Sequence, residues 1–525
     1  MVCDFFSDEY FFAFKNIYLS RLLNRSYWYY LFEVCNLTIN SCENYPKVVN
    51  DVLLVEEEIF MTEYRIESDT LGEVKIPKTA LWGPQTERSR HNFPTGELMP
   101  LSIIRALLQI KKAAAQSNVE VGDEPKDKGK AIIEAVDQLL SLDDTDLRKD
   151  FPLHVYQTGS GTQTNMNTNE VVANLAMKLH PGLTILPNDD VNRGQSSNDT
   201  YPTAMNLVAV EGLDKLEPAI QHLIDELKVK QNKYWKTVKV GRTHLQDAVP
   251  LTFGQEVSGY ISALKHDLSY LKQLSPTLLE LAIGGTAVGT GLNAAEGMPA
   301  RIVEKLSTVY GHKFEVKTNK FYGLAHHSGI NVVHGALKTL AADMFKIAQD
   351  IRFLASGPRA GYGELNIPAN EPGSSIMPGK VNPTQAEAVT MAAVRVFGND
   401  TTISIASSQG NFEMNVYKTV MIAAFIESVD LLTGTITGFA DLLVHGLTVN
   451  SKRMDDLLEN SLMTVTALSP HIGYHEAATI AQTADKNGTT LRQAALESGK
   501  VTAEQYDEWM NLLNMTNVDK ATPED

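Results

Sequence analysis

The stretch GSSIMPGKVNP, from Gly373 to Pro383, combines turn-forming residues with side chains that could hold an anion. Asn382 is a good helix N-cap, Pro383 suits the first helical position, and Gln385 stands where a capping-box partner belongs. Lys380 therefore lies beside a predicted helix N-terminus, where free N–H groups and the helix dipole favour negative charge. The sequence predicts an anion-binding loop with two serine hydroxyls.

A nucleotide-binding phosphate loop matches this stretch poorly, because that motif requires Gly, four residues, and then Gly-Lys-Ser/Thr. Five residues separate Gly373 from Gly379, and Val381 replaces the hydroxyl that would bind magnesium. A capped surface turn is the simpler alternative, because Gly, Pro, Ser and Asn all favour turns. The ligand of this loop must be decided from the rest of the chain.

Three more polar stretches precede predicted helices: QTGSGTQTNMNTNE (157–170), PNDDVNRGQSSNDTYP (187–202) and GRTHLQDAVP (241–250). The third is followed by Thr252 and Gln255, a capping-box pattern. Each stretch taken alone could be a capped turn. Four polar loops, each leading into a helix N-terminus, could instead converge on one anionic ligand with amides, hydroxyls and a lysine.

Long helices are predicted to position these loops. Apolar residues recur at alternating steps of four and three over 216–227, 257–271 and 333–354. Each segment has one apolar seam, as in a helix bundle, and the helix that contains the last, of roughly 25 residues, would extend about 37 Å. A short strand-like piece around a Leu-Gly turn is expected within Tyr64–Pro77.

Composition limits the classes of function. The 525 residues carry a formal net charge of -17, so no basic excess exists to neutralise nucleic-acid phosphates. None of the three cysteines lies after Cys42, which excludes a disulfide framework for the main body and fits a reducing compartment. The histidines form no recognised metal motif, and no run of 18 apolar residues occurs, so we expect neither a metal site nor a membrane span.

Residues 1–60 differ in composition from the remainder. They contain all three cysteines and 14 of the 40 aromatic residues. Charged residues interrupt the apolar runs, which makes the segment a poor secretory signal, and its acidic residues argue against a mitochondrial presequence. Composition becomes ordinary from Met61. We expect the natural chain to begin at Met61 and residues 1–60 to be an atypical extension outside the fold.

Four stretches together resemble the class II fumarases of the fumarase/aspartase superfamily: TGSGTQTNMN, PNDDVNRGQSSND, GRTHLQDA and GSSIMPGKVNPTQ. The similarity extends from about Thr62 to the C-terminus. Gly379 and the following Thr384–Gln385 favour a fumarase over an aspartase, whose loop resembles MPAKVNPV. The resemblance implies an all-α subunit of three domains, whose central long helices form a twenty-helix core in a homotetramer.

The resemblance also implies domain limits and an activity. An N-terminal domain is expected over 61–196, a central helical-bundle domain over 197–450 and a small C-terminal domain over 451–525. The implied reaction is the reversible hydration of fumarate to (S)-malate, a hydro-lyase step of the tricarboxylic acid cycle. The enzyme would act in the cytoplasm, use no cofactor and no metal, and bind neither nucleic acid nor membranes.

The family's catalytic roles transfer to three matching positions. Ser374 resembles the base that takes the C3 proton of malate, and His244, paired with Glu387, resembles the residue that handles water at C2. Each site would combine loops from three subunits. The matching substrate-binding residues are Ser160, Gly161, Thr162, Ser196, Ser197, Asn198, Thr243, Ser375, Lys380, Val381 and Asn382.

These residue types suit the reaction. Proton loss beside a carboxylate places further negative charge on that carboxylate, which a fixed cation and amide donors stabilise. A serine acts as a base only where its alkoxide is stabilised by the same field. A histidine oriented by a carboxylate exchanges a proton with water at the other end of the substrate.

One position departs from the family pattern. Fumarases often carry a histidine just before PNDDVN, in a second dicarboxylate site outside the catalytic pocket. The corresponding residues are Leu186, Pro187, Asn188 and Asp189. Because Leu186 lacks the imidazole, we expect this outer site to be weak.

Two rival functions share many of these signals. An ammonia lyase of the same superfamily would keep the fold, Ser374 and Lys380, but prefer aspartate. A binding or scaffold protein could keep the fold and lose catalysis, as lens crystallins of this superfamily did. The presence of a full catalytic and binding set argues against the second alternative: Thr162, Asn198, His244, Ser374, Lys380 and Glu387.

Overall fold

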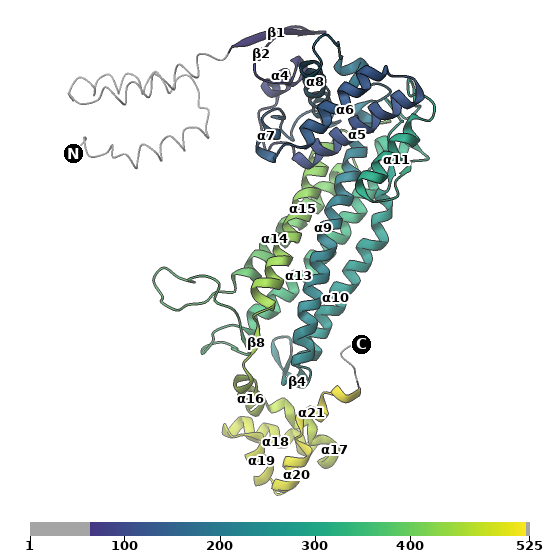
Figure 1. Ribbon diagram of the computed structural model, residues 1–525. Helices are drawn as coiled ribbons and strands as arrows, with labels where there is room; N and C mark the ends of the chain where they lie inside the picture. Colours follow the sequence, from purple (N-terminus) through teal and green to yellow (C-terminus); the bar gives the residue numbers. More distant parts are fainter. Residues whose placement is uncertain (1–62, 521–525) are drawn as a thin grey trace, which may run out of the picture. The chain divides into compact units, whose positions relative to one another are not determined.

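The computed structural model describes residues 63–520 (Figure 1). Helices dominate this part of the chain, and its strands are confined to four two-stranded sheets. The predicted all-α class is confirmed. The expectation for residues 1–60 lies outside the described residues, and the predicted domain limits remain a prediction.

The described chain begins with a hairpin and a group of helices. Strands β1 (Tyr64–Asp69) and β2 (Gly72–Pro77) pair around a turn where Gly72 has a φ of 114°, as the Leu-Gly turn predicted. The helices that follow are α4 (Pro84–Asn92), α5 (Leu101–Val121), α6 (Lys126–Leu140), α7 (Asp144–Arg148) and α8 (Thr162–Leu179).

Five long helices form a bundle in which α9 packs against α10 and α15, and α14 packs between α13 and α15 (Figure 1). Their apolar seams supply most of the main core, as the alternating steps of four and three predicted. The bundle helices are α9 (Ser197–Lys233), α10 (Phe253–Leu274), α13 (Ser328–Leu354), α14 (Thr384–Ser407) and α15 (Lys418–Phe439).

Shorter elements connect the bundle helices and lead from the last of them, α15, to the C-terminal helices. Strands β3 (Val238–Thr243) and β4 (Gln246–Thr252) form an antiparallel hairpin between α9 and α10. The other connecting elements are η3 (Ser275–Leu278), β5 (Glu280–Leu281), α11 (Met298–Tyr310), β6 (Glu315–Val316), α12 (Lys320–Ala325), β7 (Leu365–Asn366), η4 (Ala440–Val444) and β8 (Thr448–Val449).

The C-terminal helices have a small apolar core of their own. Leu468, Ile480, Leu491 and Tyr506 are buried together in it. The elements of this region are α16 (Ser451–Asn460), η5 (Leu462–Ala467), α17 (Ser469–Ile472), α18 (Tyr474–Asn487), α19 (Leu491–Glu497), α20 (Ala503–Trp509), α21 (Leu512–Met515) and η6 (Val518–Lys520).

Two stretches expected as polar loops are partly helical. Helix α8 begins at Thr162, inside the stretch 157–170, and α9 begins at Ser197, inside the stretch 187–202. The first stretch was misassigned because its polar side chains are buried and hydrogen-bonded. Glu170, for example, accepts from the backbone N–H groups of Gly83, Gln85 and Thr86 at 2.9–3.1 Å.

Among the described residues, one helical segment is long and apolar enough to cross a membrane, namely Lys418–Val444. Its mean hydropathy is 1.5, and 56% of the most apolar window is buried inside the protein. The helix of this segment, α15, packs against α9, α13 and α14. Its apolar composition is therefore accounted for by its place in the bundle.

A buried carboxyl group on α10, that of Asp267, lies beside the half-buried Asp343 of α13. Asp267 is 1% exposed, and neither of its carboxylate oxygens accepts a hydrogen bond within the described part of the chain. Burial, together with the nearby Asp343, raises the pKa of Asp267 to about 7. The folded state thus holds a proton that the unfolded chain releases above about pH 4.

This proton makes stability pH-dependent. Because the folded pKa of Asp267 is raised, stability falls as pH increases from about 4 to 7 and stays reduced above that range. We predict that Asp267→Asn, which cannot ionise, gains melting temperature over the wild type progressively across this range. Thermal melts between pH 4 and pH 9 test this, with the exposed Asp455→Asn as control. An offset that does not change with pH would contradict the assignment.

Candidate active site

The N-termini of α8 and α9 bring several predicted binding residues together. The Oγ of Ser160 lies 2.9 Å from the Oγ1 of Thr162, which lies 2.8 Å from the Oγ of Ser197. The side-chain amide of Asn198 donates to the carbonyl of Ala287 at 2.7 Å. A chain of hydroxyls therefore crosses two helix starts, a setting that favours anion binding.

Two glycines allow the backbone to pass closely here. Gly161 caps α8 with a φ of 84°, and a Cβ there would lie 2.2 Å from the ring of Tyr201. A Cβ on Gly159 would lie 1.4 Å from the carbonyl oxygen of Val416. The carbonyl of Gly159 accepts the backbone N–H of Lys418 at 3.0 Å. The TGSGT stretch is thus held against the start of α15.

Asp199 anchors the start of α9. It forms a capping box with Ser196, whose N–H it accepts at 2.9 Å, and it also accepts the N–H groups of Gly284 and Thr286 at 3.0 and 2.9 Å. The side chain is fully buried, and burial raises its pKa. Asp199 is not among the residues predicted for the site, although Ser-x-x-Asp is a capping signal.

A second buried network holds the turn that precedes α9, which contains Asn192 and Gln195. The Nζ of Lys111 donates to Asn192 Oδ1 at 2.9 Å and to Gln195 Oε1 at 3.0 Å. The amides of Asn165 and Asn169 on α8 donate to the same Asn192 oxygen at 3.1 and 3.2 Å. Burial lowers the pKa of Lys111 to about 7. No periodic signal in the sequence distinguished this lysine.

The GRTHLQDAVP stretch was predicted as a loop, and this prediction is wrong because the stretch forms the β3–β4 hairpin. His244 and Leu245 make its two-residue turn with φ values of 57° and 61°, as in a type I′ turn. His244 and the preceding Thr243 are exposed. The capping box of Thr252 and Gln255 is confirmed.

Charged pairs fasten the hairpin to the segment that leads to the GSSIMPGKVNP loop. Arg242 makes two 3.0 Å hydrogen bonds to the carboxylate of Glu364, which is fully buried. Lys239 pairs with Glu256 at 2.6 Å and lies 3.6 Å from Glu364. The guanidinium of Arg242 also stacks over the ring of Tyr362. His244 is therefore presented from a rigid base.

The GSSIMPGKVNP loop is closed at its neck. The backbone N–H of Gly373 donates to the carbonyl of Lys380 at 3.0 Å, and the amide of Asn382 donates to the carbonyl of Gly373 at 2.7 Å. The Oγ of Ser374 accepts the backbone N–H groups of Ile376 and Met377 at 3.2 and 3.0 Å. Ser374 thus lies where two donors favour a negative oxygen.

The predicted N-cap of the following helix is wrong. Helix α14 begins at Thr384, so Pro383 holds the cap position and provides no side-chain cap. The amide of Asn382 is used to close the loop instead. Ser375, Lys380 and Val381 are exposed in this loop.

A single chain does not assemble the predicted set. The hydroxyl chain lies at the start of α9, whereas His244 follows its end, and the 37 residues of α9 extend about 55 Å (Figure 1). Glu387 lies in the first turn of α14. Within the described residues, no hydrogen bond or ion pair joins Glu387 to His244.

The four residues of the outer site lie at a π-helical turn (Pro187–Val191). Leu186 is 45% exposed, and Asn188 and Asp189 are also exposed. The neighbouring Asp190 is buried and paired with Lys128 at 2.9 Å. The weakness of this outer site remains a prediction.

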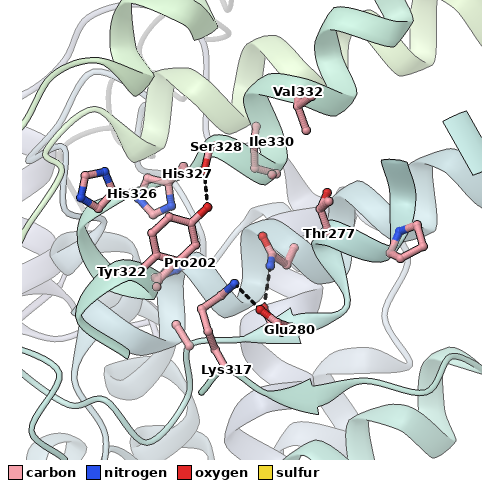
Figure 2. A pocket seen from close by; sticks show the side chains of 15 residues that line it. Pro202, Thr277, Glu280, Lys317, Tyr322, His326, His327, Ser328, Ile330 and Val332 are labelled. Carbon is pink, nitrogen blue, oxygen red and sulfur yellow. Dashed lines mark hydrogen bonds and ion pairs between the residues drawn. The ribbon is translucent and has the colours of Figure 1, made fainter. Parts of the chain in front are cut away.

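A cavity of about 500 Å³ lies beside the start of α13 (Figure 2). Tyr322 bonds to Ser328 in its wall, and Lys317 pairs with Glu280 at 2.9 Å. The buried His327 also belongs to the lining. None of the predicted site residues lines this cavity.

Comparison with known proteins gives the family. A family model described as a lyase matches residues 72–398, and a model described as the fumarase C C-terminus matches residues 465–517. The class II fumarate hydratase of Listeria monocytogenes is 53% identical over 457 residues, which cover 86% of this chain and 100% of that protein. The chain belongs to the class II fumarase family. The prediction from the four motif stretches is confirmed.

Other relatives agree with this family. The class II fumarate hydratase of Haemophilus ducreyi is 52% identical over 461 residues, covering 86% of this chain and 99% of that protein. The crystal structure of class II fumarase from Schistosoma mansoni aligns with a TM-score of 0.82 and 40% identity, covering 86% of this chain and 99% of that chain. The fumarase fold is therefore present.

We predict that Gly159→Ala disrupts the TGSGT stretch. A methyl group 1.4 Å from the Val416 oxygen must displace backbone, and overpacking of this kind costs about 1–3 kcal/mol or more. The variant should melt several degrees below the wild type. Gly259→Ala on α10 is the matched control, because nothing lies within 4 Å of its Cβ and alanine favours helix. Equal melting temperatures for the two variants would refute the close approach.

Proposed function

We propose that this chain catalyses the reversible hydration of fumarate to (S)-malate at a site assembled from several copies of itself. The family assignment supports the reaction. The assignment of Ser374 as the catalytic base is supported by the two backbone N–H groups that donate to its Oγ. The substrate is a small dicarboxylate, and the loops described above offer anion-binding groups for both of its ends.

Ser374 is the proposed base for the C3 proton. A serine hydroxyl is a weak base until its alkoxide is stabilised, and two backbone N–H groups at about 3 Å provide that stabilisation. Lys380 in the same loop adds a positive charge for the carboxylate on which charge develops. The proton leaves C3 for Ser374 while the developing negative charge spreads onto that carboxylate.

His244 is the proposed group at C2. Its imidazole is exposed at the tip of a rigid hairpin turn, so it is available to a neighbouring copy of the chain. Glu387 is the proposed partner that would orient the ring, because a carboxylate stabilises the protonated imidazole. In dehydration the imidazolium protonates the departing C2 hydroxyl, and in hydration the neutral imidazole takes a proton from the attacking water.

The remaining predicted residues are the proposed carboxylate binders. Ser160, Thr162, Ser197 and Asn198 lie at the starts of α8 and α9, where backbone N–H groups add to their own donors. The others are Gly161, Ser196, Thr243, Ser375, Val381 and Asn382. Leu186 leaves the outer site without an imidazole, so the catalytic pocket is the proposed main site for malate.

A homotetramer is the proposed working form. The distance between the ends of α9 requires different copies to bring the hydroxyl chain and His244 together. Helix α14 carries large apolar side chains that are exposed in the single chain, including Met391 at 67% and Val394 at 60%. Association of the bundle helices would cover them. The cytoplasm is the proposed location, which the absence of cysteines after Cys42 supports.

The activity is tested by the loss of fumarate absorbance in water, with an aspartate-forming assay in fumarate plus ammonia as the comparison. We predict that Ser374→Ala lowers kcat by about 100-fold or more, the usual contribution of a general base. Binding of a dicarboxylate inhibitor should persist. Turnover within threefold of the wild type would remove Ser374 from this role, and aspartate formation as the main reaction would reject the hydratase.

Hybrid oligomers test the shared site. Ser374→Ala and a Ser197→Val, Asn198→Ala double variant should each be nearly inactive alone. Mixed and reassembled at equal amounts, they should recover about one quarter of wild-type activity, because each group comes intact from a random half of the copies. Recovery requires the two groups to come from different chains. A mixture no more active than its components would show that one chain supplies both.

A further inference from the structure

Within residues 63–520, the side chain of a buried lysine at the start of α15 has no hydrogen-bond partner. Lys418 is 0% exposed, and its Nζ is unpartnered within the described residues. Its backbone N–H donates to the carbonyl of Gly159, the residue before Ser160. The backbone of Lys418 therefore lies beside the stretch that carries the hydroxyl chain, and its buried ammonium lies close enough to Asp199, in the first turn of α9, to be attracted by that carboxylate.

Lys111 provides an instructive contrast. It is equally buried, but its Nζ donates to the side-chain oxygens of Asn192 and Gln195. Burying an ammonium without such partners is costly, since nothing replaces the lost hydration. An apolar side chain at position 418 would stabilise the fold more than a buried ammonium does. The charge of Lys418 therefore needs an explanation outside stability.

The groups around Lys418 leave a positive excess. Asp199 on α9 attracts its ammonium, but that carboxylate already accepts three backbone N–H groups and also attracts Lys111. His327, before α13, is buried, and its Nε2 has no hydrogen-bond partner in the part of the chain that the structure describes. Burial and the charge of Lys418 lower its pKa to about 3, so it is neutral. Figure 2 shows His327 in the lining of the neighbouring cavity.

We propose that Lys418 determines affinity for the dicarboxylate substrate through its buried charge, without touching the ligand. This inference rests on the proposed function. The ammonium adds to the field of the α8 and α9 N-termini, where Ser160, Thr162 and Ser197 are placed to receive a carboxylate. The substrate and the transition state are both anionic, so the positive charge of Lys418 stabilises both when they are bound. It therefore acts mainly on KM and little on kcat.

Lys418→Met and Lys418→Arg in the full chain test this positioning role. For Lys418→Met, we expect KM for fumarate and malate to rise about tenfold, the scale of a unit charge acting across several ångströms of partly polar protein. Its kcat should change by less than about threefold. Lys418→Arg keeps the charge and should restore KM to within about threefold of the wild type.

Melting temperatures separate this role from a structural one. Lys418→Met removes an unpartnered charge and should melt at or above the wild-type temperature. Lys111→Met, the matched control, leaves the oxygens of Asn192 and Gln195 without their donor and should melt lower. A Lys418→Met variant that melts as low as Lys111→Met would make Lys418 a structural residue and overturn the proposal.

The pH profile gives an independent readout. Burial lowers the pKa of Lys418 to about 8, so the free enzyme loses this charge as pH rises through about 8. The wild-type kcat/KM should then fall more steeply above this pH than that of Lys418→Arg, whose guanidinium stays charged. Identical alkaline limbs in the wild type and Lys418→Arg would contradict the role of the ammonium.

Failure of this inference differs from failure of the proposed function. If the wild type does not hydrate fumarate, the proposed function is wrong and the inference falls with it. If the wild type is active but KM of Lys418→Met stays within twofold, only the role of Lys418 is wrong. A raised KM that Lys418→Arg does not restore would assign the effect to side-chain shape rather than charge.

Discussion

The length of α9 is the constraint on which the arrangement of the site depends. Its N-terminus carries Ser197 and Asn198, and its C-terminus leads into the hairpin that presents His244. A continuous helix of 37 residues is rigid and about 55 Å long. Two prolines, Pro202 and Pro218, lie within it without ending it, because neighbouring helices hold it on its sides. In the proposed assembly, each end therefore finds its catalytic partners on another copy.

This separation explains why so many buried polar contacts lie near the helix starts. A site completed by other chains cannot rely on those chains to shape each half. The capping box of Asp199, the hub at Asn192 and the paired Arg242 and Glu364 fix each half within its own chain. The hydroxyl chain and the hairpin tip are thus preorganised in the single chain, which would lower the entropy cost of the proposed association.

The sequence predicted the helices well where an apolar seam was continuous. The segments 257–271 and 333–354 lie within α10 and α13, and the family was identified from four motif stretches. The predictions fail where a polar segment is buried rather than exposed. The asparagines of α8 are polar but buried in a hydrogen-bonded network, and only tertiary contacts determine this. The hairpin around His244 lacks the glycine that usually signals its turn.

The motifs in the sequence indicated most of the candidate site residues, but not the buried charges that support them. Ser374, His244 and the hydroxyls stand in recognisable motifs, whereas Lys111, Asp199 and Lys418 lie on helices whose periodic pattern attracts no notice. Their roles follow from their burial and from the hydrogen-bond partners of each charged group. Lys111 is satisfied by two amide oxygens, and Asp199 by three backbone donors. Lys418 is the member of this group whose charge has no hydrogen-bond partner among the described residues, which is why we propose that it acts on an anion bound at the adjoining helix starts.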